Sequence, residues 1–216
     1  AYGIRVEDSS APALTDNRIL DIRAGAGRVE PSGPEDEAGS GSAVAMDLSN
    51  CPAAVITGNI VAGIDGGSRG DSGGLPFSNG HAGVCLKAKN LADGQVERLT
   101  CTGIGSGTSR VGIGVWLDQP QTGPLYVIGS IVSTYTILHD CRDGAVFGSL
   151  AGIGCLISDP RFANPAGRDY RLFKDSPGID TGPPDAPCTM EPMPNGCRAN
   201  IVAFAGTGEA AWRVGA

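Results

Sequence analysis

The chain has 216 residues, of which 34 are glycine and 18% are charged, and its formal net charge at pH 7 is −7. This balance excludes binding to a phosphate backbone, which needs clustered Lys and Arg to displace counterions. No apolar run reaches the length of a membrane-spanning helix, so no membrane span is predicted. The glycines follow no G-X-Y period and alternate with regular apolar segments, which indicates many tight turns rather than collagen or disorder.

In chain order, the first feature is an internal repeat. Gly3-Ile4-Arg5-Val6 aligns with Ala45-Met46-Asp47-Leu48, and residues 14–22 align with residues 56–64. Both alignments have the same offset of 42 without a gap, and they place Asn17 on Asn59. We expect an Asn at this corner of the chain because Asn tolerates the left-handed conformation and its amide can bond to its neighbours.

Two further copies of the repeat follow. The third copy comprises residues 83–86 and 96–104, and the fourth comprises 115–117 and 127–135, with Ser130 at the asparagine position. The segments are short, rich in Val, Ile and Thr, and alternate with period two, which predicts strands. Short strands that repeat every 30 to 40 residues or so bury an apolar face only by stacking, so the repeat predicts a solenoid of parallel strands.

The chain opens directly on strand-like residues 2–6, in phase with the repeat. A first rung without a cover would leave its strand edges and apolar lining in water. We therefore expect this end to be covered by an earlier part of the polypeptide, such as an upstream domain, or by another protein subunit.

The longest variable segments all follow the second strand pair of a repeat, so they project from one corner. One of them contains Gly70-Asp71-Ser72-Gly73-Gly74, which spells the nucleophile loop of chymotrypsin-like proteases. In those enzymes a histidine precedes the serine, but here His81 and His139 both follow it, so we do not expect a protease. Asp65 and Asp71, with nearby carbonyl groups, are a possible Ca²⁺ site, and the alternative is that they are turn-forming acids.

The C-terminal part carries the most specific motifs. Residues 158–165 read SDPRFANP, residues 168–172 read RDYRL and residues 176–182 read SPGIDTG, before RANIVAFAGTGEA at 198–210. The repeats resemble right-handed parallel β-helix repeat proteins of the pectate-lyase-like superfamily, and these later motifs resemble the ending of many bacterial surface β-helix proteins. The resemblance implies an all-β, right-handed parallel β-helix of about four to five rungs with an irregular C-terminal cap.

We assign residues 1–157 to the β-helix repeats and residues 158–216 to a capping segment of the same domain. Repeated prolines prevent a regular strand there, and the cap is expected to cover the last rung. Cys188 and Cys197 bracket a Pro-rich loop, so we predict a disulfide between them, the alternative being two independent cysteines.

The other cysteines stand at positions 51, 85, 101, 141 and 155. No C-x-x-C pair occurs, so a zinc site of the usual kind is not expected. Seven cysteines in an acidic, glycine-rich chain favour an oxidising compartment, although some could be small buried apolar residues. We expect a secreted or cell-surface protein, with the periplasm as an alternative.

Two functions from different classes follow from this fold. The first is a non-catalytic extracellular module with a structural, adhesive or assembly role, which presents loops from a rigid β-helix. The second is a carbohydrate-active enzyme, a polysaccharide lyase or glycoside hydrolase, or a polysaccharide-binding protein on the same scaffold. We favour the first because four to five rungs make a short platform and the outward positions form no stack of acids. These positions are Arg5, Asp47, Lys87, Lys89 and Glu97. We interpret Trp116 and Tyr135 as packing or edge residues rather than sugar platforms, and we assign no catalytic residue.

Overall fold

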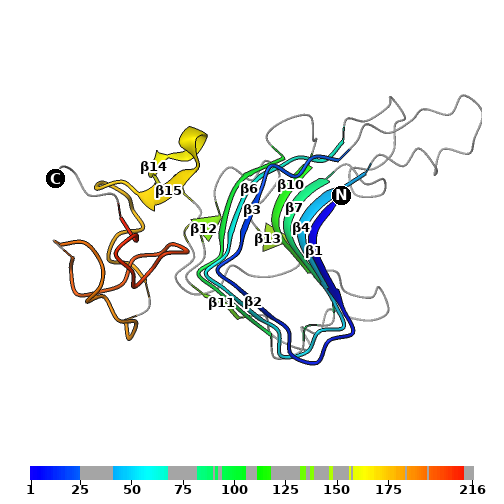
Figure 1. Cartoon of the computed structure of the whole chain (residues 1–216), viewed down its shortest axis with the longest axis horizontal. Helices are drawn as coiled ribbons and strands as arrows, with labels where there is room; N and C mark the ends of the chain where they lie inside the picture. Colours follow the sequence, from blue (N-terminus) through cyan, green and yellow to red (C-terminus); the bar gives the residue numbers. More distant parts are fainter. Residues whose placement is uncertain are drawn as a thin grey trace, which may run out of the picture.

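The computed structural model contains short strands and a single 3₁₀ turn in the part of the chain that it describes. The described residues are 1–24, 41–67, 82–89, 91, 94–105, 111–117, 132–134, 137–138, 146–147, 156, 158–182, 184–193 and 195–211. Three sheets of parallel strands wind around one axis, and a small antiparallel pair follows them (Figure 1).

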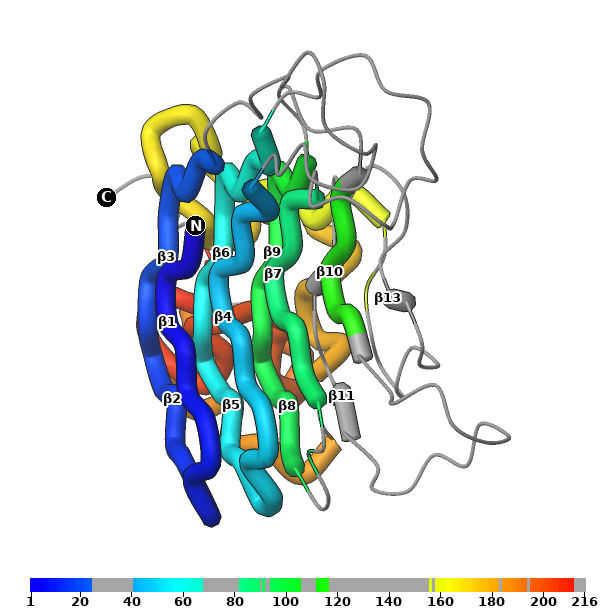
Figure 2. Tube along the Cα trace, turned by 90° about the vertical axis from the view of Figure 1, so that its right-hand side faces the viewer, coloured from blue at the N-terminus to red at the C-terminus, as the bar shows by residue number. Residues whose placement is uncertain are grey.

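The strands recur in the same order along the chain, one to each sheet. The first sheet contains β1 (Tyr2–Glu7), β4 (Ala43–Ser49), β7 (Ala82–Lys89), β10 (Val111–Leu117) and β13 (Val146–Phe147). The second contains β2 (Ala13–Thr15), β5 (Val55–Thr57), β8 (Gln95–Glu97) and β11 (Val132–Thr134). The third contains β3 (Arg18–Leu20), β6 (Ile60–Ile64), β9 (Thr100–Ile104) and β12 (Ile137–Leu138). This is a parallel β-helix, which confirms the predicted fold class, and Figure 2 shows its rungs side by side.

The register confirms the first repeat. Ile4 pairs with Met46, and Leu14 pairs with Ile56, both at the offset of 42. The boundaries of the fourth copy were wrong, because Ser133, rather than Val127, pairs with Val96. The segment between β10 and β11 is longer than its counterparts, and an alignment on apolar pattern alone placed the strand too early.

Residues in the left-handed conformation turn the chain at equivalent positions of successive rungs. One corner has Asp16, Gly58 and Arg98 at φ of 55°, 67° and 51°, and the next has Asp21, Gly63 and Gly103 at 57°, 67° and 62°. The left-handed residue therefore precedes Asn17 and Asn59, so the expected left-handed Asn was wrong. A parallel stack requires every rung to turn in the same way, whichever residue occupies the corner.

The side-chain amide of Asn59 forms hydrogen bonds inside the solenoid, and this part of the expectation for Asn is confirmed. Its side chain is fully buried, and its Oδ1 accepts from the backbone N–H of Asn17 at 3.0 Å and from the Asn17 side chain at 2.9 Å. Its Nδ2 donates to the carbonyl oxygens of Leu14 at 2.7 Å and Thr57 at 3.0 Å. The side chain thus joins two rungs where the second sheet gives way to the third.

The core is a column of apolar side chains between the three sheets. Its fully buried members include Met46, Leu48, Ile56, Ile64, Leu86 and Ile104. The equivalent side chains of the first rung, Ile4, Val6, Leu14 and Ile22, are only partly buried. The rung formed by β1, β2 and β3 is the edge of all three sheets.

One disulfide crosses the core. Cys85 in β7 and Cys101 in β9 are both fully buried and are bonded to each other. The bond joins the first and third sheets within one rung, and it fits an oxidising compartment. It was not among the predicted pairings. Cys188 and Cys197 are free thiols in the structure. Burial and the nearby Cys197 raise the pKa of the Cys188 thiol, so the two side chains are neighbours and the bond predicted between them stays a prediction.

The C-terminal segment is irregular, as predicted, but its described residues lie along the side of the solenoid (Figure 1). It contains β14 (Phe162–Asn164), η1 (Pro165–Gly167) and β15 (Asp169–Leu172). The backbone N–H of Ala203 donates to Thr100 Oγ1 at 3.2 Å, and Arg98 donates to the Ala205 carbonyl oxygen at 3.3 Å. These contacts are with the side of the solenoid, whereas we predicted that the segment covers its last rung.

The third sheet explains this placement. Its strand β6 is apolar on both faces, because the inward Val61 lies between the outward Ile60 and Ala62, and all three are buried. A parallel strand with a continuous apolar run needs cover on both sides. The C-terminal segment supplies it, because Tyr170 and Ala203 pack against Ile60 and Ala62.

We expect Asn59→Ala to lower the free energy of unfolding by about 2–3 kcal/mol, because it leaves buried backbone groups without hydrogen bonds. The matched change Asn17→Ala affects a half-buried side chain and should cost about 1 kcal/mol. Urea unfolding of both variants measures the difference. Equal losses would contradict the bridging role of Asn59.

We expect replacement of both Cys85 and Cys101 by Ala to cost about 3 kcal/mol, the stabilisation typical of a bond that closes a loop of this size. Cys51→Ala changes another fully buried cysteine, one with a free thiol, and should cost less than about 1 kcal/mol. Unfolding with and without a reductant distinguishes the cases. If reductant leaves the native protein as stable as before, the bond contributes nothing.

Candidate functional site

The outward face of the first sheet carries a row of charged residues that ends in a tryptophan. Arg5 pairs with Asp47, Asp47 with Lys87, and Lys87 with Trp116, so the row crosses four neighbouring strands in register. Neighbouring strands lie about 4.8 Å apart, so the side chains follow one another at a fixed spacing along the solenoid axis.

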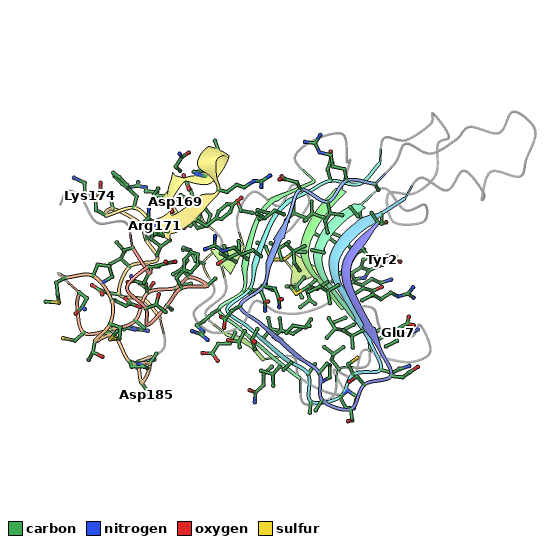
Figure 3. All side chains as sticks on the ribbon, in the orientation of Figure 1. Tyr2, Glu7, Asp169, Arg171, Lys174 and Asp185 are labelled. Atoms are coloured by element: carbon green, nitrogen blue, oxygen red, sulfur yellow. A yellow bond between two sulfur atoms is a disulfide. The ribbon has the colours of Figure 1, made fainter. Side chains whose placement is uncertain are left out.

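Aromatic rings hold the cations at both ends of this row. The Lys87 ammonium lies 4.7 Å from the centroid of the Trp116 ring, and the Arg5 guanidinium lies 5.1 Å from that of Tyr2. Arg5 also pairs with Glu7 at 2.5 Å, and its Nε lies 3.7 Å from Asp47 Oδ2. Figure 3 shows Tyr2 and Glu7 pointing away from the solenoid interior. We call Tyr2, Arg5, Asp47, Lys87 and Trp116 the charged row.

The charged row is exposed along part of its length. The side chains of Arg5 and Glu7 are about half exposed, whereas that of Asp47 is 14% exposed. Trp116 packs against the buried apolar cluster of Val84 and Ile113, which agrees with its interpretation as a packing residue. Such a face offers hydrogen-bond donors and acceptors at fixed separations on a rigid support.

A second candidate site is the groove between the third sheet and the C-terminal segment, with a volume of about 600 Å³. The third sheet contributes four small residues from β6 and β9, two of them left-handed glycines: Ala62, Gly63, Thr102 and Gly103. Asp21 lies at the equivalent corner of the first rung, and the opposite wall comes from residues 159–170. We call this cavity the side groove.

Arginines and aspartates line the side groove in equal number. Arg168 pairs with Asp21 from 147 residues away in the chain. Arg161 donates through Nη1 to the Asp175 carbonyl oxygen at 3.1 Å, and its backbone N–H donates to Asp159 Oδ1 at 2.8 Å. Arg161 and Arg168 both adopt the left-handed conformation, with φ of 52° and 62°. A left-handed backbone costs an ordinary residue about 1–2 kcal/mol, and such residues concentrate at functional sites.

Tyr170 forms the aromatic wall of the side groove. It is 7% exposed, and its ring meets that of Phe162 edge-to-face with centroids 5.5 Å apart. Burial raises the pKa of its hydroxyl, and the carboxylate of Asp21 adds to this effect. The hydroxyl therefore stays protonated at neutral pH and is available as a donor.

Beside the side groove lies a smaller cavity of about 230 Å³, which shares Arg168 and Tyr170 with it. Asp169 and Arg171 line it and form an ion pair at 2.5 Å, and the Arg171 hydrogen bond lowers the pKa of the Asp169 carboxyl. Figure 3 shows both residues on the C-terminal segment.

A buried carboxylate holds the C-terminal segment together. Glu191 is 4% exposed, and its Oε1 accepts from the backbone N–H groups of Asn200 at 3.0 Å and Gly206 at 2.6 Å. Burial raises the pKa of Glu191, the two hydrogen bonds lower it, and the nearby Asp180 raises it further, with a net increase. Asp180 Oδ1 is buried without a hydrogen-bond partner among the described residues.

The structure leaves several sequence predictions untested. Asp65 lies at a corner, where its backbone N–H donates to the Ile22 carbonyl oxygen at 2.9 Å, but Asp71 lies outside the described residues. The Ca²⁺ site therefore stays a prediction. Ser72 also lies outside the described residues, so the expectation that it is not a protease nucleophile stays a prediction too. In the part that the structure describes, no three His, Cys, Asp or Glu side chains gather at metal-binding distance.

Sequence reasoning placed Arg5, Asp47 and Lys87 on the outward face, and the structure brings these three together. Lys89 and Glu97 lie elsewhere, since Lys89 pairs with Ser49 and Glu97 belongs to the second sheet. The side groove was missed. The apolar run at 60–62 was the available signal, because it indicates a sheet covered on both faces.

Within the described residues, no helix has the length and hydropathy that a membrane crossing needs. Comparison with family models, with curated proteins and with solved structures finds no match to this chain.

We expect the stability contributed by Glu191 to be greatest at low pH. A raised pKa means that the folded protein binds this proton more tightly than the unfolded chain, so stability falls as the pH rises from the ordinary glutamate pKa towards the raised one. Glu191→Gln keeps an acceptor for both backbone N–H groups and removes the charge. Its unfolding free energy relative to the native protein should therefore increase between pH 4 and pH 7, as measured by urea unfolding.

Glu191→Ala is the matched control, since it removes the acceptor as well as the charge and should cost about 2 kcal/mol throughout this range. A native protein and a Gln variant with parallel pH profiles would contradict the raised pKa.

Proposed function

We propose that this chain is a non-catalytic adhesive module of a secreted or cell-surface protein, and that its charged row binds polysaccharide. The observation that carries the proposal is the register of Arg5, Asp47, Lys87 and Trp116 across four strands. A rigid sheet holds these groups without a loss of conformational entropy on binding, which favours affinity for a weakly binding, repetitive ligand.

The chemistry of the row supports a polysaccharide ligand. Sugar hydroxyl groups both donate and accept, so they suit a row in which guanidinium and ammonium donors alternate with a carboxylate acceptor. The rung spacing of about 4.8 Å is close to the length of one pyranose unit in an extended chain. A polysaccharide that runs along the solenoid axis would meet a new polar group at each rung.

We propose further that the chain is a member of the pectate-lyase-like superfamily. Parallel β-helices of that superfamily act on polysaccharides, and the repeats and C-terminal motifs of this chain resemble them. Fold alone does not specify chemistry. The alternative is a polysaccharide lyase on the same scaffold, which the adjacent Asp47 and Lys87 would favour, since such enzymes use carboxylates together with a basic residue.

An assembly role rests on the first rung. Its inward side chains are partly exposed, and among the described residues no strand pairs with the outer edges of β1, β2 and β3. Edges of this kind accept further strands. We propose that a coil with the same spacing of apolar residues covers this edge, either from preceding polypeptide or from a neighbouring subunit.

The test is retention of the protein on cellulose, xylan and pectin in affinity electrophoresis. We expect at least one of these polymers to retain the native protein, and Lys87→Met to weaken that retention about tenfold through loss of a charge-assisted hydrogen bond. Lys174→Met is the matched control, since Lys174 is exposed on the C-terminal segment (Figure 3), and it should bind like the native protein.

Equal retention of the Lys87 and Lys174 variants would contradict binding at the charged row, and so would the absence of retention on all three polymers. Release of unsaturated or reducing oligosaccharides during the assay would instead establish the enzyme.

A further inference from the structure

The side groove has the properties of a ligand site that is separate from the charged row. It opens on the third sheet, and its volume of about 600 Å³ is in the range of small-molecule sites. The charged row lies on the first sheet, so neither site shares a residue with the other.

The cavity exists because the sheet beneath it has small side chains. Leu20, Ala62 and Thr102 occupy one outward row of the third sheet in register. The first rung carries a leucine in this row, but the second and third rungs carry smaller residues, and they form the floor of the groove. A side chain at Gly63 would be strained, because the backbone φ there is 67° and the Cβ would lie 2.7 Å from Asp21 Oδ1.

The charges of the side groove select the class of ligand. Two guanidinium groups, of Arg161 and Arg168, are balanced by the carboxylates of Asp21 and Asp159. A bound anion would be repelled by both carboxylates, and a bound cation would be repelled by both guanidinium groups. In each case the repulsion offsets the attraction of the opposite charges. A hydroxyl group satisfies both kinds of partner, because it accepts from guanidinium and donates to carboxylate.

The aromatic wall adds an apolar surface beside these polar groups. The nearly buried Tyr170 and the edge-to-face Phe162 both line the cavity. An apolar wall with a few convergent polar groups is the usual composition of a small-molecule site. Pyranose rings combine a hydroxyl-bearing edge with a face of C–H groups, and so match both parts of the groove.

We propose that the side groove binds an uncharged, hydroxyl-rich sugar, such as one end or one branch of a neutral oligosaccharide. Asp21, Asp159, Arg161 and Arg168 bind its hydroxyl groups, and Tyr170 contacts its ring. The left-handed backbone at Asp21, Arg161 and Arg168 sets the position of three of these four side chains.

The test is an NMR titration of the full chain with maltose, cellobiose and lactose as neutral probes, and with digalacturonic acid and diglucosamine as charged probes. We expect at least one neutral disaccharide to bind about tenfold more tightly than both charged ones, with shifts at Tyr170 and Thr102. Arg161→Met should weaken this binding about tenfold and lower the thermal midpoint only slightly, because Arg161 is exposed and loses one surface hydrogen bond, to the Asp175 carbonyl oxygen.

Two further variants make the outcome specific. Lys174→Met is the matched control, because Lys174 is exposed and lies in neither site, and it should leave the shifts at Tyr170 and Thr102 unchanged. Loss of polymer retention with these shifts intact would contradict the adhesive function alone, so its failure and failure of this site are distinguishable. Asp21→Asn keeps a residue that tolerates the left-handed conformation and removes one negative charge, so it should strengthen binding of digalacturonic acid. The proposal is overturned if no neutral disaccharide binds, if digalacturonic acid binds the native protein most tightly, or if Arg161→Met has no effect.

Discussion

The structure depends on one constraint, which is that successive rungs must turn through the same backbone conformation at the same corners. Asp16, Gly58 and Arg98 share little as side chains, yet each adopts a left-handed φ at one corner. For residues other than glycine this conformation is unfavourable, and the hydrogen bonds between rungs compensate for it. At this corner the backbone N–H of Asp16 donates to the Thr57 carbonyl oxygen at 3.0 Å, and that of Gly58 donates to the Glu97 carbonyl oxygen at 3.2 Å. The buried amide of Asn59 adds bonds across the same junction. Equivalent residues then fall in rows, and both candidate sites are built from such rows.

The parts of this fold that depend on a repeated pattern could be predicted from the sequence. Period-two alternation and the offset of 42 identified the parallel β-helix, the pairing of Ile4 with Met46 and the outward position of Arg5. Conformation at the corner was assigned to the wrong residue, because both Asn and the residue before it are plausible turn formers. The register of the fourth copy was wrong because that rung has no asparagine at the corner. Without a characteristic corner residue, the position of such short strands could not be fixed.

What the sequence does not contain is the pairing between distant, non-repeating segments. The contact between Asp21 and Arg168 joins a solenoid corner to a segment that resembles nothing in the repeats. The bond between Cys85 and Cys101 is similar, since nothing in their spacing distinguishes them from the other cysteines until the strands are placed on opposite sheets of one rung. The same reasoning explains the cap. Prolines showed that the segment is irregular, but the apolar outward positions at Ile60 and Ala62 decided where it lies.

The three faces of the solenoid consequently differ in chemistry for a physical reason. The first sheet carries a partly exposed row of charged residues beside a buried apolar cluster that contains Val84 and Ile113, so the exposed part of the charged row can meet an extended ligand. In the third sheet the outward Ile60 and Ala62 of β6 are apolar, and the C-terminal segment covers them through Tyr170 and Ala203. That cover is incomplete where the row beneath it changes from Leu20 to Ala62 and Thr102, because smaller side chains no longer reach the opposite wall. The side groove is thus a direct result of laying a non-repeating segment on a repeating surface. Its polar lining comes from both, with Asp21 from a corner and the arginines from the segment, so the site exists only when the two are packed together.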